Sequence, residues 1–411
     1  MSLVPLEEVQ REILGLVTPL EVVEVALDDA LGLALGENVT TTEPVPPFAN
    51  TAMDGYAVRA ADTVGAASDT PVRLRVVGEL PAGRTPECAV GAGESIRIMT
   101  GAPIPPGADA IVMVERTARD GVDGVLIEAP AGVGDHVRPA GGDLEAGAPV
   151  FGTGTVLRAP HLGVLASVGA ARVRATRRAR VGVLSTGDEL VSPSTPGPLA
   201  AGTIRDSNRP MLIALVAEAG CEPVDLGIAP DDEAGTVAIL DDATRRYDAV
   251  LTSGGVSMGE YDYVKVALER LGSLHARQVA IKPAKPLAFG FVGGVPVFGL
   301  PGNPVSSLVS FECFARPALL ARLGHPHRFR PEVSARAEHP FTRRPDGRLH
   351  LDRVCLRATD DGYVAARTGN QASNALAASA AANGLARVPD GDSVPAGAPL
   401  RVLRLDGVPD H

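Results

Sequence analysis

The chain has 411 residues, of which 45% are hydrophobic and only 3% aromatic, and its formal net charge is -11 at pH 7. This length indicates roughly two to four domains with aliphatic cores, while the acidic balance and the lack of Trp exclude a general binder of nucleic-acid backbones or an aromatic platform for single strands. The four cysteines have no zinc or disulfide spacing, the first residues are acidic where a signal peptide is basic, and no stretch is apolar for long enough to cross a bilayer, so we expect a cytoplasmic protein without a membrane segment.

The first predicted elements are helical. Residues 5–16 carry Leu6, Val9, Ile13 and Leu16 at helical spacing, and a second short helix is expected near residues 28–33. A strand, helix, strand pattern returns at residues 143–178. These two segments could form one discontinuous domain.

Between them, residues 43–135 predict a mainly β module, because Gly and Pro punctuate short Val, Ile and Leu runs such as residues 72–77. Two segments stand out in it. Asp54 and Gly55 between apolar flanks favour a hairpin turn, and residues 97–103 predict a strand that ends in a turn. The residue types alone assign no chemistry to either segment.

The clearest alternation of strands and helices lies in residues 179–326. Four short apolar runs predict buried strands, at residues 181–184, 224–228, 249–252 and 295–300. Helices are expected between them, at residues 210–219 and 233–246. This order indicates a three-layer α/β domain around a parallel sheet.

Short strands return after residue 330. The runs at residues 348–358, 362–368 and 399–405 favour a small β-barrel or sandwich at the C-terminal end.

Ligands of open parallel sheets bind beyond the carboxyl ends of the strands, so the loops at that edge are the candidate site. Residues 253–259 (SGGVSMG) and 301–307 (PGNPVSS) are rich in Gly or Pro, a composition that lets backbone N–H groups surround an anion. Each loop alone is better explained as a tight turn, but both at one edge favour a ligand that carries phosphate. The candidate substrate-binding residues are Ser253, Gly254, Gly255, Pro301, Gly302, Asn303, Pro304 and Ser306.

The distribution of lysine supports the same location. Only three of the 38 basic residues are lysines, and Lys282 and Lys285 lie together in IKPAKP, before the last predicted strand. Their compact ammonium groups could reach phosphate or oxyanion oxygens that a rigid guanidinium meets differently. Chance clustering is the alternative.

Carboxylates also gather in these loops. They are Asp188, Glu189, Asp206, Asp231, Asp232, Glu260 and Asp262. Acidic groups repel an anionic ligand unless a cation lies between them, and oxygen ligands beside phosphate indicate Mg²⁺. For Asp206, Asp231 and Asp232 taken singly, a helix cap is about as good an explanation.

Seven segments together resemble the MoeA-type molybdopterin molybdenumtransferase family, whose relatives include the C-terminal domain of gephyrin. They are NTAMDGYAV (50–58), RIMTGAPIPPGADAIV (97–112), VGVLSTGDEL (181–190), IRDSNR (204–209), LTSGGVSMGEYDYVK (251–265), AIKPAKPLAFG (280–290) and GLPGNPVSS (299–307). They keep the order and spacing of the family over almost the whole chain.

The resemblance implies a homodimer with four domains per subunit. These are a discontinuous linking domain (1–42 and 136–178), a β-rich lid (43–135), a three-layer α/β molybdopterin-binding domain (179–326) and a C-terminal β-barrel (327–411). It also implies a transferase of molybdenum cofactor biosynthesis that takes adenylylated molybdopterin and molybdate, releases AMP with a divalent metal, and leaves molybdenum on the pterin dithiolene. The cleft is expected between the α/β domain of one subunit and the lid of the other.

The resemblance assigns further residues to this cleft. Catalytic positions match Asp54, Thr100, Glu189, Asp231 and Asp262, and the acidic positions for metal and substrate match Asp143, Glu189, Asp231 and Asp262. Lys282 matches a basic anion-binding position, Pro301 and Pro304 match the loop that shapes the pterin site, and Arg353 and Ser373 match C-terminal positions that face the cleft. The chain departs from the family at Ala140, Gly142, Gln278 and Ala284, the last in place of a usual glycine. These departures weaken the expected hold on oxyanions and the assignment of Asp143.

Two other functions stay open. The α/β domain also resembles the separate molybdopterin adenylyltransferases, although the lid and the C-terminal domain argue against that activity. A gephyrin-like scaffold ranks lower, because the sequence has no long disordered linker. The adenylyltransferase and other proteins of the pathway are possible partners, and the sequence does not separate molybdate from tungstate.

Overall fold

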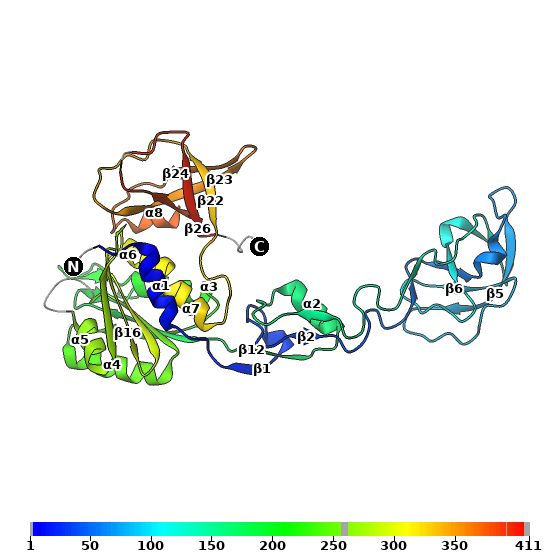
Figure 1. The fold of residues 1–411 in the computed structure, drawn as a ribbon, viewed down its shortest axis with the longest axis horizontal. Coiled ribbons are helices and arrows are strands. Elements are labelled where there is room, and N and C mark those ends of the chain that lie inside the picture. Colours follow the sequence, from blue (N-terminus) through cyan, green and yellow to red (C-terminus); the bar gives the residue numbers. More distant parts are fainter. Residues whose placement is uncertain (1–2, 256–261, 392, 407–411) are drawn as a thin grey trace. The chain divides into compact units, whose positions relative to one another are not determined.

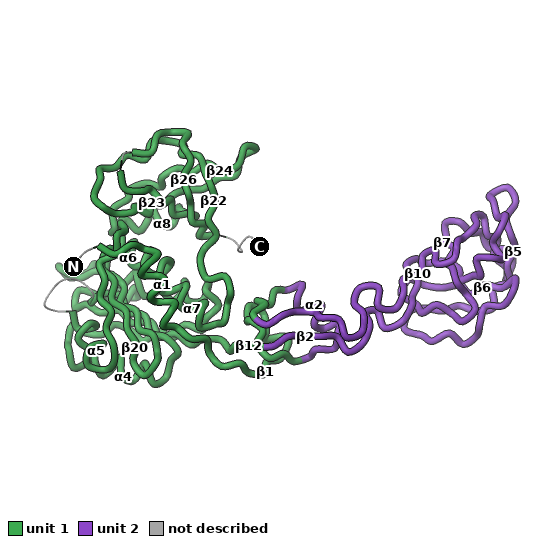
Figure 2. Tube along the Cα trace, in the orientation of Figure 1, with its two compact units in different colours: residues 1–36, 154–158, 172–411 green, residues 37–153, 159–171 purple. Residues whose placement is uncertain are grey.

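The computed structural model describes residues 3–255, 262–391 and 393–406, which pack as two compact units (Figure 2). Unit 1 takes in residues 1–36, 154–158 and 172–411, and unit 2 takes in residues 37–153 and 159–171. Each unit therefore combines segments that are far apart in the sequence. The finer division into four domains stays a prediction.

Unit 1 is built around a six-stranded sheet with the strand order β16-β13-β17-β21-β20-β18. Its four parallel strands coincide with the four apolar runs: β13 (Arg180–Thr186), β16 (Glu222–Ala229), β17 (Ala249–Ser253) and β21 (Val295–Leu300). Two antiparallel strands that the sequence analysis did not predict, β20 (Pro286–Val292) and β18 (Ser273–Gln278), extend the sheet. The central sheet is therefore mixed.

Helices cover both faces of this sheet, which gives the expected three layers (Figure 1). One face packs against α1 (Leu6–Leu16), α3 (Asn208–Glu218), α6 (Pro304–Ser310), the π-helix η4 (Phe311–Ala315) and α7 (Arg316–Arg322). The other face packs against α4 (Glu233–Arg246) and α5 (Tyr263–Leu271). Asp232 caps α4, since its carboxylate accepts a hydrogen bond of 2.6 Å from the Gly235 N–H.

Helix α1 follows the predicted helical pattern with one correction. Leu6, Val9 and Ile13 are buried in the α/β core, but Leu16, which was expected on the same face, is 45% exposed. Leu16 is the last residue of α1, and the chain leaves the helix as extended backbone at Val17. The short helix expected near residues 28–33 is a 3-10 turn at Leu27–Asp29.

The remaining strands of unit 1 form one small ribbon and a barrel. The ribbon pairs β1 (Val22–Ala26) with β12 (Arg172–Thr176). Five strands close into the barrel in the order β23-β24-β22-β26-β25, because β25 also pairs with β23. They are β22 (Glu332–Ala337), β23 (Leu349–Thr359), β24 (Gly362–Arg367), β25 (Gly384–Val388) and β26 (Pro399–Arg404), with the helix α8 at Leu376–Ala380.

Unit 2 contains its own six-stranded sheet, in the order β7-β4-β6-β5-β9-β8. These strands are β4 (Gly55–Val58), β5 (Val72–Leu80), β6 (Glu94–Ile98), β7 (Ala110–Met113), β8 (Thr117–Asp120) and β9 (Gly124–Ile127), with 3-10 turns at Ala60–Thr63 and Val114–Arg116. The other elements are β2 (Val39–Thr40), β3 (Asn50–Thr51), β10 (Val137–Arg138), β11 (Pro149–Phe151) and α2 (Ala159–Ser167). The mainly β module is confirmed.

The expected hairpin at Asp54 and Gly55 is wrong. Strand β3 pairs with β10, whereas β4 pairs with β6 and β7, so the strands on either side of Asp54 belong to different sheets. The Asp-Gly pair is a turn signal, but the signal does not specify the partner of the following strand.

Among the described residues, no helix has both the length and the apolar character needed to cross a membrane.

Candidate active site

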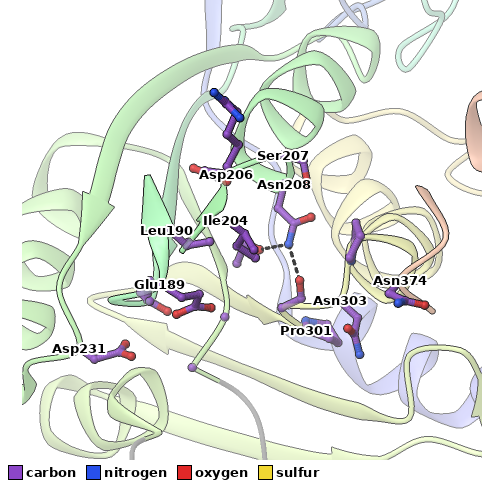
Figure 3. Close-up of a pocket in the computed structure, with 18 of the residues that line it drawn as sticks. Glu189, Leu190, Ile204, Asp206, Ser207, Asn208, Asp231, Pro301, Asn303 and Asn374 are labelled. Atoms are coloured by element: carbon purple, nitrogen blue, oxygen red, sulfur yellow. Dashed lines mark hydrogen bonds between the residues drawn. The ribbon is translucent and has the colours of Figure 1, made fainter. Parts of the chain in front are cut away.

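A cavity of about 980 Å³ lies at the carboxyl edge of the four parallel strands of unit 1 (Figure 3). Its lining residues come from the loops that follow these strands, from the small β14 and β15 pair, and from the start of α3. Strands β14 (Leu190–Val191) and β15 (Ile204–Arg205) pair with Leu190 opposite Ile204. Asn374 adds one residue from the C-terminal part of the unit.

Most of the candidate residues in this domain meet in the cavity. Those that line it are Glu189, Asp206, Asp231, Ser253, Gly254, Gly255, Asp262, Pro301, Gly302, Asn303 and Pro304. Two loops separated by almost 50 residues thus contribute to one wall, as expected for neighbouring parallel strands. The chemical roles of these residues stay predictions.

Asn208 ties these two loops together. Its Nδ2 donates a hydrogen bond of 2.7 Å to Ser253 Oγ and another of 2.7 Å to the carbonyl of Gly302 (Figure 3). Only glycine fits at position 254, because its φ is 102° and a Cβ there would lie 2.6 Å from the carbonyl oxygen of Thr186. The wall is therefore held at close range by backbone and side-chain contacts.

The structure separates the predicted carboxylates into two groups. Asp206 is 1% exposed and accepts hydrogen bonds from Ser185 Oγ (3.1 Å) and from Nε (2.9 Å) and the backbone N–H of Arg209 (3.1 Å). Asp188 accepts a hydrogen bond of 3.0 Å from the Asp231 N–H, and Asp232 caps α4. For Asp232 the helix cap left open by the sequence is observed, whereas Asp206 is held by an ion pair with Arg209 and precedes Ser207, the N-cap residue of α3. Asp206 also lines the cavity, together with Glu189 and Asp231.

Asp262 lies immediately before α5 and is 8% exposed. It forms an ion pair with Lys265, the third lysine of the chain. Burial raises the pKa of Asp262 above its usual value, and the ammonium group of Lys265 opposes this shift. Glu260 and the rest of residues 256–261 in the predicted Gly-rich loop lie outside the described residues.

The acidic residues have the donor type that Mg²⁺ prefers, but they do not form a closed cage. In the ranges that the structure describes, no three His, Cys, Asp or Glu side chains are grouped so that they could hold a metal ion. Mg²⁺ commonly uses one or two carboxylates together with substrate phosphates, and Glu189 and Asp231 can supply these. Asp143 belongs to unit 2, whereas the other three predicted metal ligands belong to unit 1.

The two lysines do not line the cavity. Lys282 and Lys285 are both exposed, and Lys282 lies in β19 (Ile281–Lys282), opposite His350 of β23. Ala284 between them has a φ of 73°, a conformation that favours the glycine usual in the family. Pro286, one residue after Lys285, does line the cavity.

Arg353, Ser373 and Ser306 also lie away from the lining. Arg353 is fully buried, and its Nη2 donates hydrogen bonds to the carbonyls of Asn370 (2.7 Å) and Ala372 (3.3 Å). Its Nε and Nη1 have no hydrogen-bond partner within the described part of the chain. The carbonyl of Ser373 accepts a hydrogen bond of 3.0 Å from the Val305 N–H, which joins this segment to α6, and Ser306 is buried.

In unit 2, Asp54 and Thr100 form a direct pair. One carboxylate oxygen of Asp54 accepts hydrogen bonds of 2.7 Å from both the backbone N–H and the hydroxyl of Thr100. These two bonds, the backbone one first, lower the pKa of Asp54. The two residues assigned by the resemblance to the lid side are therefore in contact, and Asp54 is held as a carboxylate.

The sequence analysis assigned no role to nine residues that line the cavity, among them Thr186, Leu190, Ile204 and Asn208. Leu190, Ile204 and Asn208 each lie within two residues of a named carboxylate, in the segments 181–190 and 204–209. The site was predicted from carboxylates and glycines, whereas an apolar or amide side chain at a strand end gives no chemical signal by itself.

Comparison with known proteins gives a consistent result over the whole chain. Three sequence families match successive parts: the MoeA N-terminal region (domain I and II) at residues 4–169, a probable molybdopterin binding domain at residues 182–321, and the MoeA C-terminal region (domain IV) at residues 335–405. Molybdopterin molybdenumtransferase 2 of Mycobacterium tuberculosis (strain H37Rv) is 42% identical over 406 residues, which cover 97% of this chain and 99% of that protein. The molybdopterin molybdenumtransferase of Haemophilus influenzae is 36% identical over 338 residues, 82% of each chain. A crystal structure of a molybdopterin biosynthesis MoeA protein from Pyrococcus horikoshii superimposes with a TM-score of 0.80 at 33% identity and covers 99% of this chain and 100% of that one.

Proposed function

Because the chain belongs to the MoeA-type molybdopterin molybdenumtransferase family, which it matches over almost its whole length, we propose that the cavity at the edge of the α/β sheet binds adenylylated molybdopterin. The protein is a transferase of molybdenum cofactor biosynthesis that inserts molybdate into molybdopterin. We propose the location of the reaction, the form of the substrate that is used and the residues that take part.

One observation supports this location above the others: the loops that follow β17 and β21 meet in one cavity and are joined there by Asn208. The cavity volume of about 980 Å³ is large enough for a ligand of nucleotide size. Backbone N–H groups of Gly-rich loops hold phosphate without a charged side chain. A pterin and a nucleotide joined through phosphates therefore suit this cavity.

Charge neutralisation is the second requirement, since Glu189 and Asp231 would repel a phosphate. Mg²⁺ held by Glu189, Asp231 and the phosphates would supply the positive charge that stabilises the departing AMP. The negative charge of Asp262, which is paired with Lys265, would lie near the proposed metal. The loops that follow β17 and β21 would orient the phosphates.

The oxyanion requires a separate positive region. Lys282 lies opposite His350 of β23, the strand that also carries Arg353. Two nitrogens of Arg353 have no acceptor among the described residues, although burial lowers its pKa. We propose that Lys282 and Arg353 contribute to binding molybdate, together with Ser373 from the segment that contacts α6.

The direct test is a single-turnover assay. The purified protein, given adenylylated molybdopterin, molybdate and Mg²⁺, should release one AMP for each substrate molecule consumed, and removal of Mg²⁺ should slow release by at least about 10-fold. The absence of AMP above background contradicts the proposal. Consumption of ATP with molybdopterin that carries no adenylyl group would instead support the adenylyltransferase alternative.

The resemblance also supports a homodimer in which the lid of one subunit completes the cleft of the other. Two inactive variants, Asp54→Ala in the lid and Asp262→Asn in the α/β domain, should then regain activity when they are mixed and exchange subunits. Half of the dimers would be mixed and one of their two clefts would be intact, so we expect up to about a quarter of the normal rate. If native mass spectrometry shows mixed dimers and no activity returns, the shared cleft is contradicted.

A further inference from the structure

Apart from the carboxylate of Asp262, which is ion-paired with Lys265, two buried polar atoms of residues that line the cavity have no hydrogen-bond partner within the described part of the chain. They are Oγ1 of Thr186, a residue 7% exposed, and Oδ1 of Asn208, a residue 8% exposed. Both residues line the cavity. An unpaired buried polar atom destabilises the folded protein, and a native structure rarely keeps one without a reason.

The chemistry of the Asn208 oxygen can be specified further, because its amide has only one suitable orientation. Nδ2 donates to Ser253 Oγ and to the carbonyl of Gly302, both at 2.7 Å (Figure 3). A reversed amide would place Oδ1 against the Gly302 carbonyl, so that two acceptors would face each other. Oδ1 is therefore an acceptor only, and its missing partner must be a hydrogen-bond donor.

The surroundings indicate what kind of donor this is. An ionised phosphate or oxyanion has only acceptor oxygens, as do Glu189, Asp231 and Asp262 in the same cavity when ionised, so none of these groups can pair with Oδ1. Leu190 and Ile204 add apolar surface to the cavity, and Ile204 is 56% exposed although it is a large aliphatic residue. A ligand part with an apolar face and an N–H edge matches both features.

Resting on the proposed function, we propose that Thr186 and Asn208 recognise the N–H edge of a planar nitrogen heterocycle of the substrate, whose face lies on Leu190 and Ile204. The hydroxyl of Thr186 can donate or accept, and the amide oxygen of Asn208 accepts from an amino or ring N–H group. The substrate carries two such rings, the adenine and the pterin. Both present this chemistry, and the experiment separates them.

Thr186→Val is the informative change, because it keeps the shape of the side chain and removes a hydroxyl that has no described partner in the protein. The variant should unfold at the same temperature as the normal protein or at a higher one. Thr252→Val is the matched control, since Thr252 Oγ1 is also buried without a described partner but Thr252 does not line the cavity.

The measurement is the affinity, by calorimetry, for two pairs of probes. AMP is compared with purine riboside 5′-monophosphate, which lacks the amino group, and 6-hydroxymethylpterin is compared with the corresponding lumazine, in which an oxygen replaces the amino group. For one pair we expect the normal protein and Thr252→Val to prefer the amino compound by about 10-fold or more, and Thr186→Val to lose most of that preference. The pair that responds identifies the ring.

The proposal is overturned if Thr186→Val keeps the preferences of the normal protein for both pairs, or if the normal protein has no preference in either. In those cases the proposed function still stands if the normal protein releases AMP from adenylylated molybdopterin. The two failures are therefore distinguishable.

Discussion

Replacing Asp262 by Asn should lower kcat for AMP release by about 100-fold or more, an effect comparable to the loss of one electrostatic contact at a reacting centre. The change keeps the size of a buried side chain and removes its charge. Asp262 lines the cavity at the start of α5 and is only 8% exposed, so water screens its charge poorly. The rate of AMP release in single turnover measures the effect.

Lys265→Met is the control for this change, because Lys265 pairs with Asp262 and does not line the cavity. If the Asp262 carboxylate acts on the ligand, Lys265→Met should keep most of the activity that Asp262→Asn loses. Equal losses in both variants would show that the ion pair is only structural. A rate for Asp262→Asn within about 3-fold of normal would remove Asp262 from the mechanism.

Replacing Arg343 by Met should lower the free energy of unfolding of the C-terminal barrel by about 3 kcal/mol or more. Its side chain is 1% exposed and ion-pairs with Asp346 at 3.0 Å and Asp390 at 2.6 Å. It also donates hydrogen bonds to the carbonyls of Arg348 (3.0 Å), Val388 (3.0 Å) and Pro389 (2.6 Å). Methionine removes this donor from all five acceptors, although Asp346 and Asp390 keep other hydrogen bonds. Hydrogen exchange in residues 332–404 measures the loss.

Arg357→Met makes the same change in the same barrel at an exposed ion pair with Glu338, where the Arg side chain is 53% exposed. It should leave the hydrogen-exchange protection of the barrel close to that of the normal protein, because exposed ion pairs contribute little to stability. Equal protection in the two variants would contradict the role of Arg343.

The same cluster predicts how the barrel responds to acid. Burial opposes ionisation of Asp346, but hydrogen bonds from His350 and Arg348 lower its pKa to about 2 from 3.8. The stability that this carboxylate contributes is therefore complete above about pH 4 and is lost as the pH falls toward 2.

The α/β domain was the part of the fold most accessible from sequence, because its parallel strands are buried on both faces and appear as uninterrupted apolar runs. Strands β20 and β18 escaped prediction, since β20 begins at the last proline of IKPAKP and β18 alternates apolar and polar residues such as His275 and Arg277. Pairing at the end of a sheet is decided by tertiary contacts, and local sequence specifies them weakly.

The candidate site shows the same limit. Loop positions followed from strand ends, so Glu189, Asp231 and the 301–304 loop could be placed at one edge before the structure was known. The function of each carboxylate did not follow, because Asp206 and Asp231 are the same residue type in similar loops and differ only in their neighbours. The interpretation of Asp54 as a hairpin turn failed for the same reason, since its partner Thr100 lies 46 residues away.

We propose that the nucleotide half of the substrate binds in the cavity whose two loops, 253–255 and 301–304, are joined by Asn208. A crystal of the protein soaked with AMP, Mg²⁺ and molybdate tests it most directly. We expect density for AMP in contact with the 253–255 and 301–304 loops, with metal density between its phosphate and Glu189 or Asp231. Well-defined AMP on any other surface, with this cavity filled only by solvent, would contradict it.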